Sequence, residues 1–210
     1  MITTLETPLA PMLYTDGDLI FPLAEDGDAE DLFQQVCSQF DNKKIEQDAQ
    51  GNVLVMAPTG TESSDQNSEL NEQLRSWAKK DGRGRAFDSH ATFILPNSSK
   101  RSPDASWVSY GKLKTLTHQQ LRKFPNLVPE FIVEIKSPSD RYSRLQSKME
   151  EYLENGVTLG WLIHPDKQTV AIYRQGKAVE ILVQPQTLVA DAPVDGFVLD
   201  LKPIWQGLNF

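Results

Sequence analysis

The chain has 210 residues, 39% of them hydrophobic, and a formal net charge of -8 at pH 7. This size suits one soluble domain, residues 1–210, and is short for two ordinary domains. No apolar run approaches the roughly 20 residues of a membrane-spanning helix, and a single cysteine, Cys37, excludes an internal disulfide. We therefore expect a protein of the reducing cytoplasm, without a membrane partner.

The charge is unevenly distributed along the chain. Residues 1–72 carry 15 Asp and Glu but two Lys, whereas residues 75–148 carry 15 Lys and Arg but six Asp and Glu. The basic window is compatible with a polyanionic substrate but does not require one. The acidic third could cover a basic site, meet a basic partner or keep the protein soluble, and the sequence leaves these alternatives open.

The first third predicts a helix and then a β-hairpin. Apolar residues recur at helical spacing between Asp28 and Phe40, after an acidic start that suits the positive end of a helix dipole. Residues 43–47 and 52–57 flank a short turn, in which Gly51 can adopt positive φ. We expect residues 1–57 to form this acidic helix and hairpin, and residues 58–205 to form the core of the domain.

From residue 62 onwards the pattern alternates between helices and strands. A helix is predicted up to Asp81-Gly82, a strand over Arg85–Leu95, and another strand after Pro103-Asp104. Thr117 and Gln120 form a capping-box pattern that opens a short helix before Pro125. The remaining predictions are a strand at 131–137, a helix ending at Asn155-Gly156, and strands at 160–163, 169–173, 179–183 and 197–201. This order indicates an α/β or α+β domain built around a mixed sheet flanked by helices.

The stretch FIVEIKS, residues 131–137, places two charges in a predicted buried strand. Side chains alternate along a strand, so Glu134 and Lys136 share one face. On a wet face such a pair would contribute only a few tenths of a kcal/mol. The β-branched and aromatic neighbours, however, indicate a central strand covered on both faces. Buried charges cost several kcal/mol unless they are paired or bind a metal, which makes this stretch a candidate functional site.

Asp104 supplies a possible second carboxylate, 30 residues before Glu134. That spacing leaves room for the chain to return alongside the strand that begins after Pro103. Mg²⁺ prefers oxygen ligands and usually takes one or two carboxylates with several waters. A nearby ammonium group can orient or activate water, or stabilise developing charge, during phosphodiester hydrolysis.

The pattern Pro103-Asp104 … Glu134-Ile135-Lys136 resembles the Pro-Asp … (Asp/Glu)-x-Lys signature of the restriction-endonuclease-like, or PD-(D/E)XK, nuclease superfamily. Longer phrases between Met56 and Trp205 resemble the Uma-type family of restriction-endonuclease-like proteins. Among them are MAPTGTESSDQNSELNEQL, GRAFDSHATFILPNSSKRSPDASWV and LQSKMEEYLENGVTLGWLIHP. The resemblance implies a core of a helix, a three-stranded antiparallel meander, a helix and a further strand.

The resemblance also implies an activity and a set of roles. It implies a Mg²⁺-dependent (or Mn²⁺-dependent) endonuclease that hydrolyses DNA phosphodiester bonds through a metal-activated water, without a small-molecule organic cofactor. Asp104, Glu134 and the Ile135 carbonyl would be metal ligands, and Lys136 the catalytic lysine. Many relatives carry an acidic residue on the first core helix. Glu62 is the candidate and Glu69 the competing choice, and an ordinary first-turn carboxylate explains Glu62 equally well.

Arg141, Arg144 and Lys148 recur on one face of the helix that follows FIVEIKS. They are either a solvated face or a set of phosphate contacts, with Gln146 and Lys148 nearest the site. Many enzymes of this fold act as dimers, so a homodimer is possible, although no segment identifies its interface. The alternative function is a non-catalytic member of the fold that binds nucleic acid or protein.

Overall fold

The structure is a computed structural model, and it describes residues 12–13, 18–40 and 43–208. Its centre is a six-stranded sheet in the order β12-β11-β10-β9-β8-β5. All neighbouring strands are antiparallel except β9 and β10, which are parallel, so the sheet is mixed as expected. Its strands are β5 (Gly84–Asp88), β8 (Ala105–Ser109), β9 (Phe131–Ile135), β10 (Leu159–His164), β11 (Thr169–Arg174) and β12 (Glu180–Val183).

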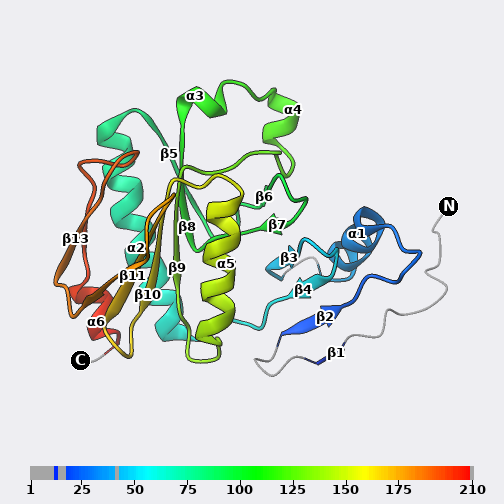
Figure 1. The fold of residues 1–210 in the computed structure, drawn as a ribbon, viewed down its shortest axis with the longest axis horizontal. Coiled ribbons are helices and arrows are strands. Elements are labelled where there is room, and N and C mark those ends of the chain that lie inside the picture. The colour runs from blue at the N-terminus through cyan, green and yellow to red at the C-terminus, as the bar shows by residue number, and fades with distance from the viewer. Residues whose placement is uncertain (1–11, 14–17, 41–42, 209–210) are drawn as a thin grey trace.

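Helices cover both faces of this sheet (Figure 1). Alternate residues of β9 face opposite sides: Phe131 and Val133 pack in the cluster that contains α2 (Thr61–Asp81), and Ile132 packs against α5 (Tyr142–Glu154). The α2 side also holds β13 (Thr187–Val189), β14 (Val198–Asp200) and α6 (Lys202–Gln206). Every residue of β9 is buried, which confirms the expected central strand.

A second six-stranded sheet, in the order β1-β2-β4-β3-β7-β6, joins the N-terminal region to the core. Its strands are β1 (Met12–Leu13), β2 (Leu19–Phe21), β3 (Ile45–Gln47), β4 (Val53–Val55), β6 (Phe93–Ile94) and β7 (Lys100–Arg101). The helix α1 (Ala29–Gln39) buries Phe33 and Val36 in a separate small core with this sheet. Two short helices, α3 (Tyr110–Leu113) and α4 (His118–Leu121), follow β8.

Several local predictions are confirmed. The helix α1 forms where the apolar spacing predicts it, and the hairpin β3–β4 closes through Gly51 at φ 87°. Thr117 and Gln120 make both hydrogen bonds of the capping box at α4. Gly82, in the left-handed conformation at φ 74°, ends α2 as the Asp81-Gly82 sequence predicts.

Other boundaries differ from the predictions. The strand predicted over Arg85–Leu95 is two strands in different sheets, because a turn at Asp88 reverses the chain: the Asp88 carbonyl accepts from the Ala91 amide at 3.1 Å. The helix α2 begins after Gly60, one turn earlier than its polar residues indicate. The polar run 137–140 forms its own turn before α5 rather than a cap. Strands β1, β2, β7 and β13 and helices α3 and α6 were not predicted.

Candidate active site

The two carboxylates named by the sequence lie at adjacent positions of neighbouring strands. The antiparallel register of β8 and β9 pairs Ala105 with Val133, so Asp104 and Glu134 are the next residues along the two chains, Asp104 directly before β8 and Glu134 within β9. The Ile135 amide donates to Asp104 Oδ2 at 2.9 Å, which fixes the orientation of that carboxylate. The chain spacing therefore brings the two acidic groups together, as the strand return predicts.

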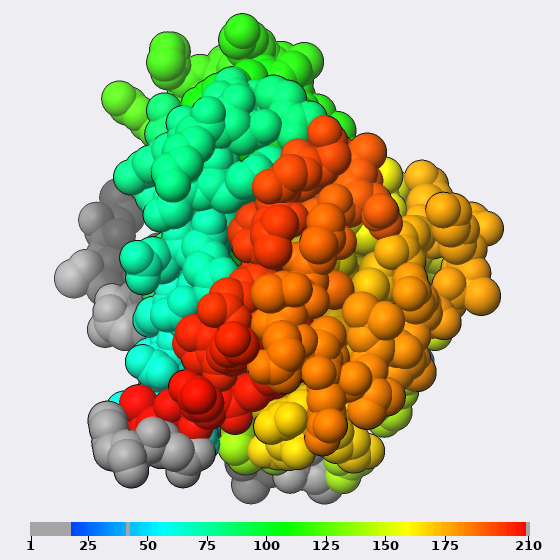
Figure 2. All heavy atoms as spheres, turned by 90° about the vertical axis from the view of Figure 1, so that its left-hand side faces the viewer, coloured from blue at the N-terminus to red at the C-terminus, as the bar shows by residue number. Residues whose placement is uncertain are grey.

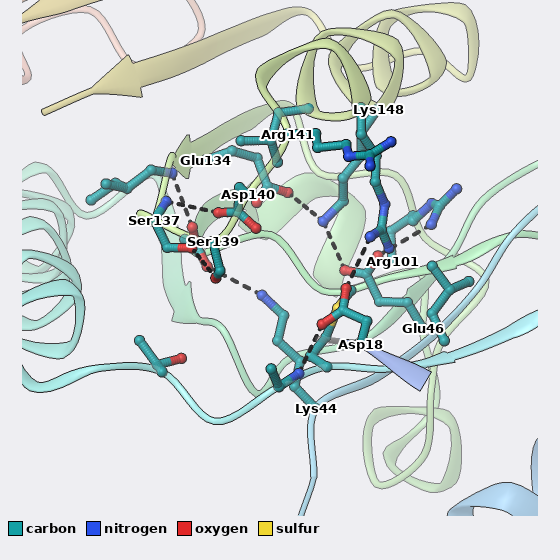
Figure 3. A pocket seen from close by; sticks show the side chains of 18 of the residues that line it. Asp18, Lys44, Glu46, Arg101, Glu134, Ser137, Ser139, Asp140, Arg141 and Lys148 are labelled. Carbon is teal, nitrogen blue, oxygen red and sulfur yellow. Dashed lines mark hydrogen bonds and ion pairs between the residues drawn. The ribbon is translucent and has the colours of Figure 1, made fainter. Parts of the chain in front are cut away.

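Both carboxylates line a cavity of about 770 Å³. One wall is the core side, with Ile135 and the loop at residues 137–141. The opposite wall comes from the N-terminal region, which contributes Asp18, Lys44 and Glu46. Figure 3 shows these groups pointing toward one another from separate elements. Residues of the acidic first third thus form part of the cavity wall.

Lys148 on α5 joins the two walls. Its Nζ lies 2.8 Å from Glu134 Oε1 and 2.8 Å from Glu46 Oε1, and Figure 3 shows the side chain pointing between these two carboxylates. The Lys148 side chain is 11% exposed, and those of Glu46 and Glu134 are 1% and 3% exposed. This ammonium therefore neutralises two buried carboxylates that originate 88 residues apart in the chain, at positions 46 and 134.

Lys44, just before β3, places a second ammonium at the site. Its Nζ lies 3.1 Å from Asp104 Oδ1, and its side chain is 27% exposed and lines the cavity. Burial opposes the charged form of Lys44, but the carboxylates of Asp104, Glu134 and Glu46 outweigh burial and raise the pKa of Lys44. Lys44 is therefore a cation at the neutral pH of the cell.

Glu46 is held as an anion by the cations around it. Burial raises its pKa, but the charges of Lys148, Arg101 and Lys44 lower it to about 2. Arg101 Nη1 lies 3.2 Å from Glu46 Oε2, and Arg101 Nη2 lies 2.6 Å from Glu151 Oε2. The Ser102 amide donates to Glu46 Oε1 at 3.0 Å. Glu46 is thus the centre of a network that links β3, β7 and α5.

The pKa of Glu134 is shifted in the opposite direction to that of Glu46. Burial is the largest effect and raises the pKa of Glu134 to about 7, although Lys148 and Lys44 favour the ionised form. The Tyr152 hydroxyl donates to Glu134 Oε1 at 3.1 Å, and burial together with the nearby carboxylates raises the pKa of Tyr152 well above 10. Tyr152 is therefore a fixed proton donor, while Glu134 exchanges its proton near neutral pH.

Lys136 lies apart from this cluster. The strand β9 ends at Ile135, and the Lys136 Nζ donates to the Ser137 carbonyl at 2.7 Å. Lys136 is half-buried and is not among the described residues that line the cavity. The ammonium groups beside Asp104 and Glu134 are instead those of Lys44 and Lys148.

The acidic candidates on α2 lie at the edge of the site or outside it. Glu62 is exposed and lines the cavity, with its carboxylate against the backbone of Gly207. Glu69 accepts a hydrogen bond from Gln73 at 2.7 Å and does not line the cavity. Of the two, Glu62 alone faces the cavity.

The three basic positions predicted as phosphate contacts all line the cavity, whereas Gln146 does not. Arg141 and Arg144 line the cavity with Lys148, and Arg144 Nη1 lies 2.9 Å from Asp18 Oδ2. Gln146 is exposed, lies outside the cavity lining and interacts with Tyr173. The periodicity of α5 contains the signal for Lys148, which is four residues before the buried Tyr152 and adjacent to the buried Met149. Sequence reasoning missed Asp18, Lys44 and Glu46 because single charges in an acidic segment carry no such periodic signal.

The donor set fits a hard divalent cation. Asp104, Glu134 and the Ile135 carbonyl would supply the oxygen ligands, and Mg²⁺ is commonly held by one or two carboxylates with waters. Within the described residues there is no group of three or more His, Cys, Asp or Glu side chains arranged to hold a metal. The Lys44 ammonium already contacts the Asp104 carboxylate, so this carboxylate already has a cation beside it. A metal ion held there by Asp104 would require Lys44 to move.

Comparisons with known proteins concern the fold and the family of the chain. No curated protein matches the chain. A crystal structure of a protein from Anabaena variabilis ATCC 29413, described as "a putative nuclease belonging to DUF820", superposes with a TM-score of 0.66 at 23% identity, over 77% of this chain and 89% of that one. The likeness shows that this chain has the α+β, restriction-endonuclease-like fold. None of the helices in the described ranges is long and apolar enough to cross a membrane.

The sequence itself matches one family over residues 29–202, a range that includes every cavity residue discussed above except Asp18. The description of that family is "Putative restriction endonuclease". The match covers most of the chain and includes both the N-terminal hairpin and the core sheet. The chain therefore belongs to the Uma2 family, as the sequence resemblance predicts.

Proposed function

We propose that the chain is a metal-dependent endonuclease that hydrolyses DNA phosphodiester bonds with a water molecule. One observation carries the proposal: Asp104 and Glu134 meet on adjacent strands at a cavity that also receives the ammonium groups of Lys44 and Lys148. Carboxylates that share a site with fixed cations are the chemistry that phosphodiester hydrolysis needs. The family and the fold support the same reaction class.

The carboxylates are the residues that would hold Mg²⁺ or Mn²⁺, with the Ile135 carbonyl as a further oxygen ligand. When bound, the ion supplies a more acidic water and neutralises charge on the phosphate. Glu134 must be ionised to act as a ligand, and its pKa of about 7 keeps a large ionised fraction at neutral pH. The amide of Ile135 keeps Asp104 in a fixed orientation through its 2.9 Å hydrogen bond.

The ammonium groups of Lys148 and Lys44 have different roles in this proposal. Lys148 is held by Glu46 and Glu134, so its geometry is fixed before substrate arrives. Lys44 has a more exposed side chain and one carboxylate contact, so it can turn from Asp104 toward a phosphate oxygen. The sequence pattern makes Lys136 the catalytic lysine, but Lys136 does not line the cavity. We therefore assign that role to Lys148 and Lys44 instead.

Metal binding and DNA nicking on the same samples test the proposal. Calorimetric titration with Mg²⁺ and Mn²⁺, together with plasmid nicking, compares the wild type with Glu134→Gln. The exposed Glu72 on α2, which does not line the cavity, provides the matched control Glu72→Gln. We expect Glu134→Gln to lose both metal binding and nicking while Glu72→Gln keeps both. Wild-type protein that binds neither ion and leaves DNA intact would refute the proposal.

A non-catalytic role on the same scaffold is the second candidate. The observation that favours it is the completeness of the ion pairing: Lys44 satisfies Asp104, and Lys148 satisfies Glu134 and Glu46. Such a network can serve structure alone. Under this alternative Glu134→Gln changes the free energy of unfolding, and the wild type binds DNA or a protein partner with no dependence on divalent cations.

A further inference from the structure

The open edge of the central sheet carries exposed apolar side chains. The strand β12 is the last strand of that sheet and pairs with β11 on one side, and no described strand pairs with its other side. Ile181 is 62% exposed and Val183 is 72% exposed. Together with Val189, they are the most exposed large hydrophobic residues in the part of the chain that the structure describes. In Figure 2 the orange atoms of this part of the chain lie at the surface of the molecule. Natural edge strands usually carry charges or bulges that prevent pairing.

The register with β11 determines which backbone groups of β12 are unpaired. The Gln184 amide donates to the Gln168 carbonyl at 2.7 Å, so the even-numbered residues direct their backbone groups toward β11. Backbone direction alternates along a strand, and the N–H and C=O groups of Ile181 and Val183 therefore point to the open edge. The two most exposed apolar side chains of β12 thus belong to the two residues of that strand whose backbones can accept another strand.

This edge is complementary to itself. In an antiparallel pair with a two-fold axis through Leu182, Ile181 lies opposite Val183 of a second copy, and the reverse pair forms on the other side of the axis. Both members of each pair have side chains on the same sheet face and backbone groups at the open edge, so each pair can exchange two hydrogen bonds. We propose that the chain forms a homodimer by antiparallel pairing of β12 with β12 of a second copy.

Charge permits this pairing. Glu180 is already bound to Arg174, with Arg174 Nη1 2.7 Å from Glu180 Oε2, and a two-fold axis at Leu182 does not place Glu180 opposite Glu180 of the second copy. An unrelated peptide would have to supply matched apolar residues, whereas a second copy supplies them by symmetry. The result is a continuous twelve-stranded sheet, from two copies of the six-stranded one. No residue of β12 lines the cavity, so each copy keeps a complete site.

Sedimentation equilibrium on the full chain tests the interface. We expect the wild type to be a dimer and Val183→Lys to be a monomer at the same concentration, because the substitution places a charge opposite Ile181 of the second copy. Val189→Lys is the matched control: Val189 is 67% exposed but lies on β13, and this variant should stay dimeric. A wild-type monomer at the highest concentration reached, or a dimer that survives Val183→Lys, would overturn the proposal.

Disulfide trapping tests the register independently. Residues that pair without hydrogen bonds in antiparallel strands have Cα atoms about 4.5 Å apart, within the range of a disulfide. In a Cys37→Ser background, Leu182→Cys should therefore form a covalent dimer under mild oxidation, since Leu182 meets itself on the axis. Ile181→Cys should not, because its symmetry mate lies two residues away. Trapping of Ile181→Cys in preference to Leu182→Cys would contradict this register.

Discussion

Replacement of Lys148 by Met tests whether Lys148, rather than Lys136, is the lysine that belongs to the site. The change keeps most of the side-chain volume but leaves the buried carboxylates of Glu46 and Glu134 without the ammonium that lies 2.8 Å from each. Removal of one member of a buried ion pair costs about 3–5 kcal/mol. We expect a loss of this size in the free energy of unfolding, measured by urea denaturation at about pH 8.

The loss should depend on pH in a direction fixed by Glu134. Burial raises the folded-state pKa of Glu134 to about 7 from 4.5, so in the wild type this group stabilises the fold below pH 4.5, and that stability is lost as pH rises to about 7. Without Lys148 the folded pKa is higher still, so the variant continues to lose about 1.4 kcal/mol per pH unit above pH 7. The difference between variant and wild type therefore grows from pH 7 to pH 8.

Lys136→Met provides the comparison for this prediction. Lys136 is half-buried, and its ammonium donates a hydrogen bond to the Ser137 carbonyl, so its replacement should cost about 1 kcal/mol or less. Nicking activity, measured at a pH where both variants are folded, should fall with Lys148→Met and persist with Lys136→Met. A Lys148 variant as stable as the wild type at both pH values, or a Lys136 variant that is the more damaged of the two, would refute the reasoning.

Three further predictions concern the metal, a close backbone approach and the core. Mg²⁺ affinity, measured by calorimetry, should rise about tenfold per pH unit up to pH 7 and then level off, because protons compete for Glu134 below its pKa; affinity independent of pH would exclude Glu134 as a ligand. Gly84→Ala should destabilise the fold by about 1–3 kcal/mol in urea, since its Cβ would overlap the Trp107 ring and the Val108 carbonyl; an unchanged midpoint would contradict this. Phe131→Ala should cost about 3–5 kcal/mol in the same assay, because Phe131 is fully buried and packs edge-on against Trp161 at 4.9 Å; a loss below 1 kcal/mol would show that the core collapses around the gap.

The sequence predicted the elements that have strong local signals. The helix at 28–40 and the hairpin after it follow from apolar spacing, an acidic first turn and a glycine that adopts positive φ. The pairing of Asp104 with Glu134 was predictable because two strands separated by one return of the chain become neighbours. The strand at 85–95 was predicted wrongly, since a period of two does not reveal that β5 and β6 belong to different sheets.

The cation partners of the site show where a local pattern stops being informative. Glu134 and Lys136 alternate onto one face only while the strand continues, and β9 ends at Ile135, so Lys136 is free to turn toward the Ser137 carbonyl. Lys148 reaches the same carboxylate from a helix because it lies on the buried side of α5, next to Met149 and one turn before Tyr152. Helical periodicity contains that information, although a basic stripe was the simpler interpretation.

Lys44 and Glu46 could not be assigned from local pattern, because their place depends on a contact between sheets. The pairing of β3 with β7 joins Gln47 to Lys100, and this carries the neighbouring Lys44 and Glu46 across to Asp104 and Lys148. Before that pairing forms, Glu46 is a solvated acid in an acidic segment; afterwards its pKa is lowered to about 2 by three cations. The N-terminal hairpin is therefore a structural part of the site. Removal of the first third of the chain should destroy one wall of the cavity rather than expose an intact cavity to solvent.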